Sequence, residues 1–412
     1  MITKKQFEKL AGIELIEENG KLVYDDDLFL EDRTDIKELP DNFKVLGFLD
    51  LNGSGVTKLP KGLEVESFLE ISETEIEELP EDTKFGGSLY VSYMKKPFSF
   101  TKVFKVDGHL ECIGTRIKQM PEELYVKYNC NFSESIFDNY PKVMEVGSSL
   151  YMYDAAITKL PEGLKEVYGG VDINNTKLTK LNDNLVVYDI LNLGYTQIEE
   201  LSKGLIVGDE LDLRNTNLRD YSILHKVCSK FVVTEEKYNE IKDTLAEHSK
   251  EIIWGNECVT FKPNYKGAYL FENENGKYIK ADNIFAKIVE QKGNVYHIKL
   301  GKSEDITYLI TDGDGRWSHG YTLEGAKDDL LYKISKRNKD NYKHLSLNSK
   351  LSFENAIVCY RVITGACAFG TKDFVENRLG ENKKDKYTIK EIIELTKGEY
   401  GNKTFKKFFF RD

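Results

Sequence analysis

The stretch that decides the fold is "ITKLPEGLKEVYGGVDINNTKLTKL", residues 157–181. It contains Thr-Lys-Leu at 158–160 and again, about twenty residues later, at 176–178 and 179–181. A similar spacing separates six prolines, each preceded by a hydrophobic residue, with one longer interval where a copy lacks its proline: Pro40, Pro60, Pro80, Pro121, Pro141 and Pro161. A period near twenty residues predicts a solenoid, because a unit of this size buries its apolar side only against its neighbours.

Every repeat contains an L-x-L unit, in which two apolar residues flank one variable position. Ten copies fit between residues 28 and 221, beginning at Leu28, Leu49, Leu69, Leu89, Leu110, Cys130, Leu150, Val171, Leu191 and Leu211. This alternation predicts a short strand with its two apolar side chains pointing inward and the middle residue pointing outward. A Thr or Ser follows most copies, and we expect its hydroxyl to bond neighbouring backbone where the chain leaves the strand. Proline then keeps the return segment from becoming helical.

The pattern V-x-G-x-L-x-L-x-x-T-x-I-x-x-L-P-x-x-L resembles the short, Leu-Pro-containing class of bacterial leucine-rich repeats, with Thr or Ser where the commonest consensus has Asn. The resemblance covers residues 28–221. It implies a leucine-rich-repeat solenoid with a parallel β-sheet on its concave side and little helix. The alternative is a run of unrelated β-hairpins. The copy at 85–104 lacks both the Thr and the Leu-Pro, so we expect a local kink or protrusion there.

The remaining segments are expected to cap the solenoid or to fold separately. Residues 1–27 predict an N-terminal cap with a short amphipathic helix that presents Phe7, Leu10 and Ile13. Residues 222–250 predict a C-terminal cap and a helix that starts near Thr234. Residues 251–412 predict an α+β domain, because strand-like runs are followed by helical patterns from Thr322 onward.

Charge is distributed unevenly along the chain. Of the 58 Lys and Arg and the 69 Asp and Glu, residues 1–230 contain 27 and 41, a net charge of −14. Residues 231–412 contain 31 and 28, a net charge of +3. Because affinity for duplexes comes mainly from Lys and Arg on phosphates, we do not expect the solenoid to bind nucleic acid directly. A protein partner with a basic surface suits it better.

The sequence also bears on the compartment. No apolar run approaches the ~18 residues that a membrane span needs, and the first twenty residues lack the apolar core of a secretory signal. Six cysteines without a CxxC pair are typical of reduced thiols. We therefore expect a protein without membrane association in the cytoplasm of a bacterial host cell.

The outward positions of the L-x-L units predict a binding surface, because stacked strands bring them into one column. Five of these ten positions are carboxylates and three are aromatic. The predicted partner-binding residues are Asp50, Glu70, Tyr90, Glu111, Asn131, Tyr151, Asp172, Asn192 and Asp212, with Tyr153 just after one unit. The simpler interpretation is that these residues only keep the sheet hydrated. The functional interpretation is a rigid acidic surface, with tyrosine anchors, that binds a basic protein patch.

No motif in the C-terminal half indicates a catalytic, metal or cofactor site. "TDGDGRWSHG", residues 311–320, offers Asp312, Asp314 and His319 but lacks the closing Glu of a calcium loop, so a hairpin turn is expected. Cys359 and Cys367 are expected to pack in the core. A cysteine-nucleophile site built on Cys367 is the alternative. The chain has no P-loop, HExxH, zinc spacing or GxSxG motif.

Residues 310–334 and 360–379 resemble the C-terminal part of proteins from phages and prophages of low-GC bacteria. This resemblance implies an accessory phage protein that acts inside a bacterium. We therefore predict a non-enzymatic binding protein that inhibits a bacterial defence system, for example a nuclease complex. The alternative is an effector enzyme with a cysteine-based C-terminal domain, either ubiquitin-ligase-like or hydrolytic. The ligase resemblance lacks its Cys-x-Asp motif, since the cysteines here are followed by Tyr-Arg and Ala-Phe.

Overall fold

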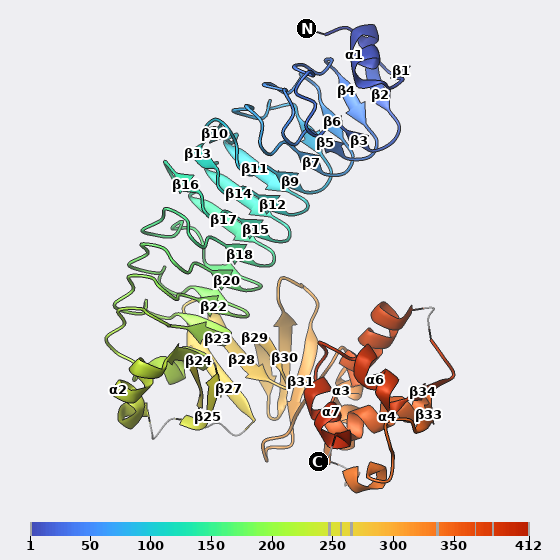
Figure 1. The fold of residues 1–412 in the computed structure, drawn as a ribbon. Helices are drawn as coiled ribbons and strands as arrows, with labels where there is room; N and C mark the ends of the chain where they lie inside the picture. Colours follow the sequence, from blue (N-terminus) through green and yellow to red (C-terminus); the bar gives the residue numbers. More distant parts are fainter. Residues whose placement is uncertain are drawn as a thin grey trace. The chain divides into compact units, whose positions relative to one another are not determined.

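The computed structural model describes residues 2–245, 249–255, 258–263, 267–334, 338–366, 368–380 and 383–410. The chain forms two compact units. The first unit contains Met1–Asn264 with Phe271–Gly276, and the second contains Tyr265–Leu270 with Lys277–Asp412. The first is a parallel β-solenoid of about 11 turns with little helix, as the repeat predicted (Figure 1). The second contains an antiparallel sheet and most of the helices.

The L-x-L units form one continuous ladder of short parallel strands. Each strand pairs in parallel with the corresponding strand of the next coil. The apolar residue that starts each of these strands is buried. The strands are β3 (Leu28–Phe29), β5 (Leu49–Asp50), β7 (Leu69–Glu70), β9 (Leu89–Tyr90), β12 (Leu110–Glu111), β15 (Cys130–Asn131), β18 (Leu150–Tyr151), β20 (Val171–Asp172), β22 (Leu191–Asn192) and the end of β23 (Ile206–Asp212).

A second set of parallel strands precedes the L-x-L ladder and forms two separate runs, one on each side of the copy at 85–104. Alternate residues of its longer strands are buried, among them Val45, Phe104, Leu124 and Met144. The strands are β2 (Lys21–Tyr24), β4 (Phe43–Val45), β6 (Glu64–Val65), β8 (Lys84–Phe85), β11 (Val103–Val106), β14 (Glu123–Val126), β17 (Val143–Val146), β19 (Glu166–Val167), β21 (Val186–Val187) and the start of β23. At β23 the second set and the L-x-L ladder merge into one strand.

A local kink or protrusion was expected for the copy at 85–104. Its strand β9 stays in the L-x-L ladder, whereas the neighbouring strands β8 and β11 fall in two different sheets. Its strand β10 (Phe98–Ser99) pairs in parallel with β13 (Arg116–Gln119), which pairs with β16 (Ile136–Phe137), and these form a third small sheet. The buried ring of Phe98 lies at the position of Ile117 in the next copy, and the buried ring of Phe100 lies level with the Leu-Pro segments of the neighbouring copies, with the two ring centroids 5.1 Å apart. The register shifts between β10 and β13, and the strands that precede the L-x-L ladder are interrupted at this copy, between β8 and β11.

Each coil turns away from the L-x-L strand through a residue in the left-handed backbone region. This conformation is strained for residues other than glycine. The hydrogen bonds of the ladder offset this strain. All but the last of the turn residues donate their N–H to a carbonyl of the next coil at 2.7–3.1 Å. The residues are Asp32, Gly53, Glu73, Tyr93, Gly114, Glu134, Asp154, Asn175, Tyr195 and Asn215.

The Thr that follows this turn has the role predicted for it. The buried hydroxyl of Thr74 donates to the Ile71 carbonyl at 2.7 Å, and Thr176, Thr196 and Thr216 bond in the same way at 2.7–3.0 Å. The hydroxyl of Thr115 instead donates to the Val91 carbonyl of the preceding coil. These bonds satisfy carbonyl groups that would otherwise be buried without a partner.

One continuous hydrophobic core extends from Phe7 to Val259, and both of its ends are covered. At the start, α1 (Lys4–Ala11) places Phe7 against Phe43 with ring centroids 5.5 Å apart, beside the hairpin of β1 (Ile16–Glu18) and β2. At the other end lie η1 (Leu224–Lys226), β24 (Cys228–Thr234), α2 (Glu235–Leu245), β25 (Ser249–Gly255) and β26 (Cys258–Pro263). Strands β25 and β26 extend the solenoid sheet. The first unit therefore continues beyond residue 250, where the sequence placed the domain boundary.

The second unit contains most of a six-stranded sheet in chain order, and only the segment Phe271–Gly276 of this sheet falls in the first unit. The strands of the sheet are β27 (Ala268–Asn273), β28 (Gly276–Ala281), β29 (Ile284–Lys292), β30 (Val295–Leu300), β31 (Thr307–Thr311) and β32 (Trp317–Gly320). The predicted hairpin turn at 312–316 joins β31 to β32, and the Asp312 carboxylate accepts hydrogen bonds from the backbone N–H of Asp314 and Arg316. Helix α3 (Leu323–Ile334) packs Ala326 and Leu330 against Ile310.

The rest of the unit is mainly helical. It consists of η2 (Lys339–Tyr342), β33 (Lys350–Ser352), α4 (Phe353–Thr364), α5 (Ala368–Asp373), the π-helical turn η3 (Phe374–Leu379), β34 (Lys386–Thr388), α6 (Ile389–Leu395) and α7 (Asn402–Phe409). Strands β33 and β34 pair antiparallel. Ser352 and Thr388 cap the helices that follow them, which places both helix starts next to this strand pair. A separate core contains Cys359, Tyr360 and Phe405.

Candidate functional site

The acidic column is the set of outward residues of the L-x-L ladder. Consecutive members are direct partners across the parallel strands, so they occupy equivalent positions in successive coils. The column consists of Phe29, Asp50, Glu70, Tyr90, Glu111, Asn131, Tyr151, Asp172, Asn192 and Asp212. Tyr153 lies outside it, two residues beyond Tyr151. Neighbouring strands in a sheet are about 4.8 Å apart, so the column presents its polar groups at close and regular intervals.

Most polar members of the column also hold the turn that follows them. The Asp50 carboxylate accepts a hydrogen bond from the backbone N–H of residue 52 at 2.9 Å, and the Glu70 carboxylate does the same for residue 72 at 2.7 Å. Asn131, Asp172, Asn192 and Asp212 make equivalent bonds. These side chains therefore contribute to folding, because they satisfy backbone donors at the strand ends. Glu111 makes no such bond with any described residue.

A row of aromatic rings lies beside the N-terminal part of the column. Phe29 contacts Phe48 with ring centroids 4.8 Å apart, Phe48 stacks on Phe68 at 4.3 Å, and Phe68 meets Tyr90 at 5.7 Å. Phe29 is 65% exposed, which is unusual for a phenylalanine in a row of contacting rings. The sequence interpretation missed Phe48 and Phe68. Their signal was present, since a phenylalanine directly precedes the L-x-L unit in two successive copies.

The electrostatics of the column differ along its length. The ten positions contain no Lys or Arg. Burial raises the pKa of Glu70, and the neighbouring carboxylates of Asp50 and Glu111 raise it further, against the hydrogen bonds from residue 72 that lower it. At the C-terminal end, Asp212 is buried and forms an ion pair with Arg214 at 2.6 Å. Asp212 is therefore the least accessible of the predicted binding residues.

The raised pKa of Glu70 predicts a pH-dependent contribution to stability. Folding favours its protonated form, so its contribution is greatest below the usual carboxyl pKa and is lost as the pH rises through the raised value. Glu70→Gln removes the charge and keeps the acceptor for residue 72. We expect the variant to be more stable than the wild type at neutral pH, with the difference shrinking toward about pH 4. Urea unfolding at several pH values measures this, with the exposed Glu162→Gln as the control. A larger free energy of unfolding for the wild type than for Glu70→Gln at neutral pH would contradict the raised pKa of Glu70.

The second unit contains a cavity of about 310 Å³ that the sequence did not indicate. Part of its wall is the turn between β28 and β29, where Asp282 and Asn283 both have positive φ, as a two-residue hairpin of this kind requires. The Asp282 carboxylate accepts hydrogen bonds from Nδ1 of His319 on β32 at 2.8 Å and from the His319 backbone N–H at 3.1 Å. The ammonium of Lys333 also contacts Asp282.

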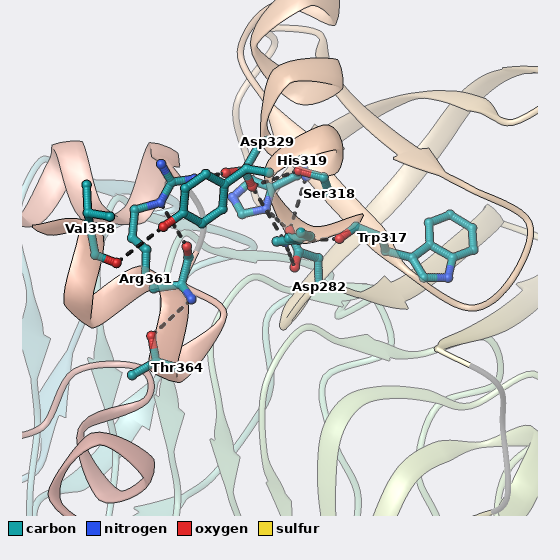
Figure 2. Close-up of polar contacts among 11 residues, drawn as sticks. Asp282, Trp317, Ser318, His319, Asp329, Val358, Arg361 and Thr364 are labelled. Carbon is teal, nitrogen blue, oxygen red and sulfur yellow. Dashed lines mark hydrogen bonds and ion pairs between the residues drawn. The ribbon is translucent and has the colours of Figure 1, made fainter. Parts of the chain in front are cut away.

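A buried charge network continues behind this wall (Figure 2). The Asp329 carboxylate forms an ion pair with the Arg361 guanidinium, lies 3.5 Å from Nζ of Lys333, and accepts the hydroxyl of Ser318 at 2.8 Å. Only 1% of the Asp329 side chain is exposed. The guanidinium of Arg361 also stacks on the ring of Tyr332 at 4.0 Å. Burying charges in this way is costly unless each has partners, and here each has at least one.

The other residues singled out in the C-terminal half behave differently. Cys359 is fully buried, and burial raises the pKa of its thiol to about 12, so the thiol remains protonated at neutral pH. Cys367 lies outside the described residues. In the described ranges, no group of three His, Cys, Asp or Glu side chains is arranged to hold a metal ion. Nor is any helix of the described chain long and apolar enough to cross a membrane.

Comparison of the chain with known proteins finds no matching family model, no matching curated protein and no matching solved structure.

Proposed function

We propose that the protein is a non-enzymatic, leucine-rich-repeat-type binding protein whose acidic column binds a basic surface of a partner protein. The observation that carries this proposal is the register of the column. Carboxylate, amide and aromatic side chains recur at one position over ten coils, and no Lys or Arg interrupts them. The electric fields of the carboxylates in such a row add up along its length, which favours association with an extended positive patch.

The aromatic row supports an interface rather than a merely hydrated sheet. Exposed rings are costly in water, and aromatic residues surrounded by polar groups are common anchors in protein interfaces. Phe29, Phe48, Phe68 and Tyr90 provide such anchors beside the carboxylates of Asp50 and Glu70. Because the ladder fixes the backbone of every coil, little conformational freedom is lost on binding.

A nucleic-acid-binding protein is the partner class that fits this surface best. Its groove carries Lys and Arg for phosphates, so an acidic column competes for the same positive charges. The resemblance of residues 310–334 and 360–379 to phage proteins favours a bacterial defence nuclease, or a regulator of one, as the target. Direct binding of nucleic acid by the column is disfavoured, because carboxylates repel phosphates.

Salt dependence tests this proposal and identifies the partner in the same experiment. The full chain is immobilised and then incubated with bacterial lysate at low ionic strength. We expect it to retain a basic protein, which mass spectrometry identifies. A salt gradient should release that protein as the ionic strength passes about 0.15 M, where the screening length falls to about 8 Å. Retention that is unaffected up to about 1 M salt, or retention of acidic proteins alone, would contradict an electrostatic interface.

A further inference from the structure

We propose that the second unit binds a small organic cation, an amine with an apolar body, in the cavity beside Asp282. The site is separate from the acidic column, and it does not depend on the proposed protein partner. A cavity of about 310 Å³ is large enough for a ring with a short side chain. For scale, a dry cavity of about 150 Å³ accepts a benzene.

The walls of the cavity suit the apolar body of such a ligand. Helix α4 supplies Phe353 and Tyr360, η3 supplies Phe374, β34 supplies Tyr387, and Tyr400 follows α6. Aromatic rings pack against apolar groups, and their negative faces also attract ammonium groups. Several of these rings are fixed in place: the Tyr360 hydroxyl donates to the Tyr400 carbonyl at 2.7 Å, and the Tyr387 hydroxyl accepts the N–H of Lys384 at 2.8 Å.

The charged groups of the lining favour a cation over an anion. The lining includes the carboxylates of Asp282, Asp373 and Glu399, and no Lys or Arg is among the described residues that form it. Asp282 is balanced by Lys333, and the Asp329 carboxylate behind it is balanced by Arg361. Asp373 and Glu399 therefore set the sign of the potential at the cavity. Glu399 lies 3.7 Å from Nε of Arg378, whose side chain is 73% exposed, so this pair is well screened by water.

The charge network also explains why the wall facing the ligand is rigid. Asp282 is held at once by His319 and by Lys333, which come from the last strand of the sheet and from α3. Structural ion pairs of this kind keep a site open in one geometry before a ligand arrives, and this lowers the entropic cost of binding. The network thus has a positioning role, whereas Asp373, Glu399 and the aromatic rings contact the ligand.

Three ligands of nearly equal shape test the proposal on the full-length protein. The probes are 2-phenylethylamine, which is cationic at neutral pH, the neutral 2-phenylethanol and the anionic 3-phenylpropanoate. Calorimetry and thermal shift should show binding of the amine, at least tenfold weaker binding of the alcohol and none of the carboxylate. Benzyltrimethylammonium should bind comparably to the amine, because a cation–π site does not require N–H donors. Equal affinity for the amine and the alcohol, preference for the carboxylate, or no binding of either cation would overturn the proposal.

A matched pair of variants locates the site. The double variant Asp373→Asn/Glu399→Gln should weaken amine binding about tenfold and leave the fold intact, because neither carboxylate is buried. The control Glu376→Gln/Glu394→Gln changes two exposed carboxylates of η3 and α6 that do not line the cavity, and it should bind the amine as the wild type does. Equal loss of affinity in both variants would show that general surface charge, and not this cavity, attracts the amine.

Discussion

Replacing Asp329 by alanine is expected to destabilise the second unit by about 3–5 kcal/mol, the usual result of removing one partner of a buried ion pair. The carboxylate pairs with Arg361 and accepts the hydroxyl of Ser318, and the side chain of Arg361 is only 14% exposed. Without Asp329 the guanidinium would remain buried, with only the Ala366 carbonyl at 3.2 Å and the ring of Tyr332 as described contacts. The charge would be only partly compensated, and its desolvation would oppose folding.

The adjacent residue provides the control for this prediction. Asp328 lies on the same turn of α3 but is exposed, so Asp328→Ala should change the free energy of unfolding by no more than about 0.5 kcal/mol. Chemical denaturation followed by tryptophan fluorescence suits the comparison, because Trp317 lies in the second unit. The double variant Asp329→Leu/Arg361→Met should recover most of the loss, since it removes both charges together. Equal stability of the two alanine variants would mean that the network is not buried in the folded protein.

The solenoid was predictable from sequence because its information is local and repeated. A single L-x-L unit such as residues 191–193 is a weak signal, but ten copies at one spacing determine the strand, its register and the column together. The same repetition indicated the role of Thr176 and its equivalents. The copy at 85–104 was less predictable, because Phe98 and Phe100 fill the positions of Ile and of the Leu-Pro segment without matching the repeat pattern.

The second unit was less predictable because its important contacts join distant residues. Asp282 meets His319 across 37 positions and Lys333 across 51, and Arg361 meets Asp329 across 32. No spacing rule relates such pairs in one sequence, since they meet only after the sheet and the helices have packed. His319 was singled out from sequence, but as a neighbour of the "DGDGR" turn and not as a partner of Asp282. The hydrogen bonds from the following turn to Asp50 and Glu70 were missed for a different reason. Such a bond does not change the spacing of apolar residues along the sequence.

Reversing the charge of the acidic column is expected to weaken partner binding at least a hundredfold. The variant is Glu70→Lys/Glu111→Lys/Asp172→Lys, which places three ammonium groups opposite a basic surface. Like-charge juxtaposition costs several kcal/mol, and each 1.4 kcal/mol is tenfold in affinity. Two of the three carboxylates also hold turns, so the variant should lose about 1 kcal/mol of stability for each hydrogen bond removed.

Two further variants separate the effect of the column charge on binding from the effect of the substitutions on stability. Glu70→Gln/Glu111→Gln/Asp172→Asn keeps the side-chain acceptors, so it should retain stability while still weakening binding. Glu81→Lys/Glu162→Lys/Glu200→Lys makes the same change in net charge away from the column, next to two Leu-Pro segments and the equivalent Leu-Ser segment. This third variant should bind within about threefold of the wild type, because exposed charges outside the contact are screened by salt and contribute little.

The most direct test of the acidic column is the affinity of the isolated partner for the wild type and for these three variants, measured across a salt series. The account predicts that both column variants lose affinity, that the Leu-Pro variant keeps it, and that wild-type affinity falls as the ionic strength rises from about 0.05 M to about 1 M. Equal affinity of the wild type and both column variants at every salt concentration would contradict it and would show that the column only hydrates the sheet.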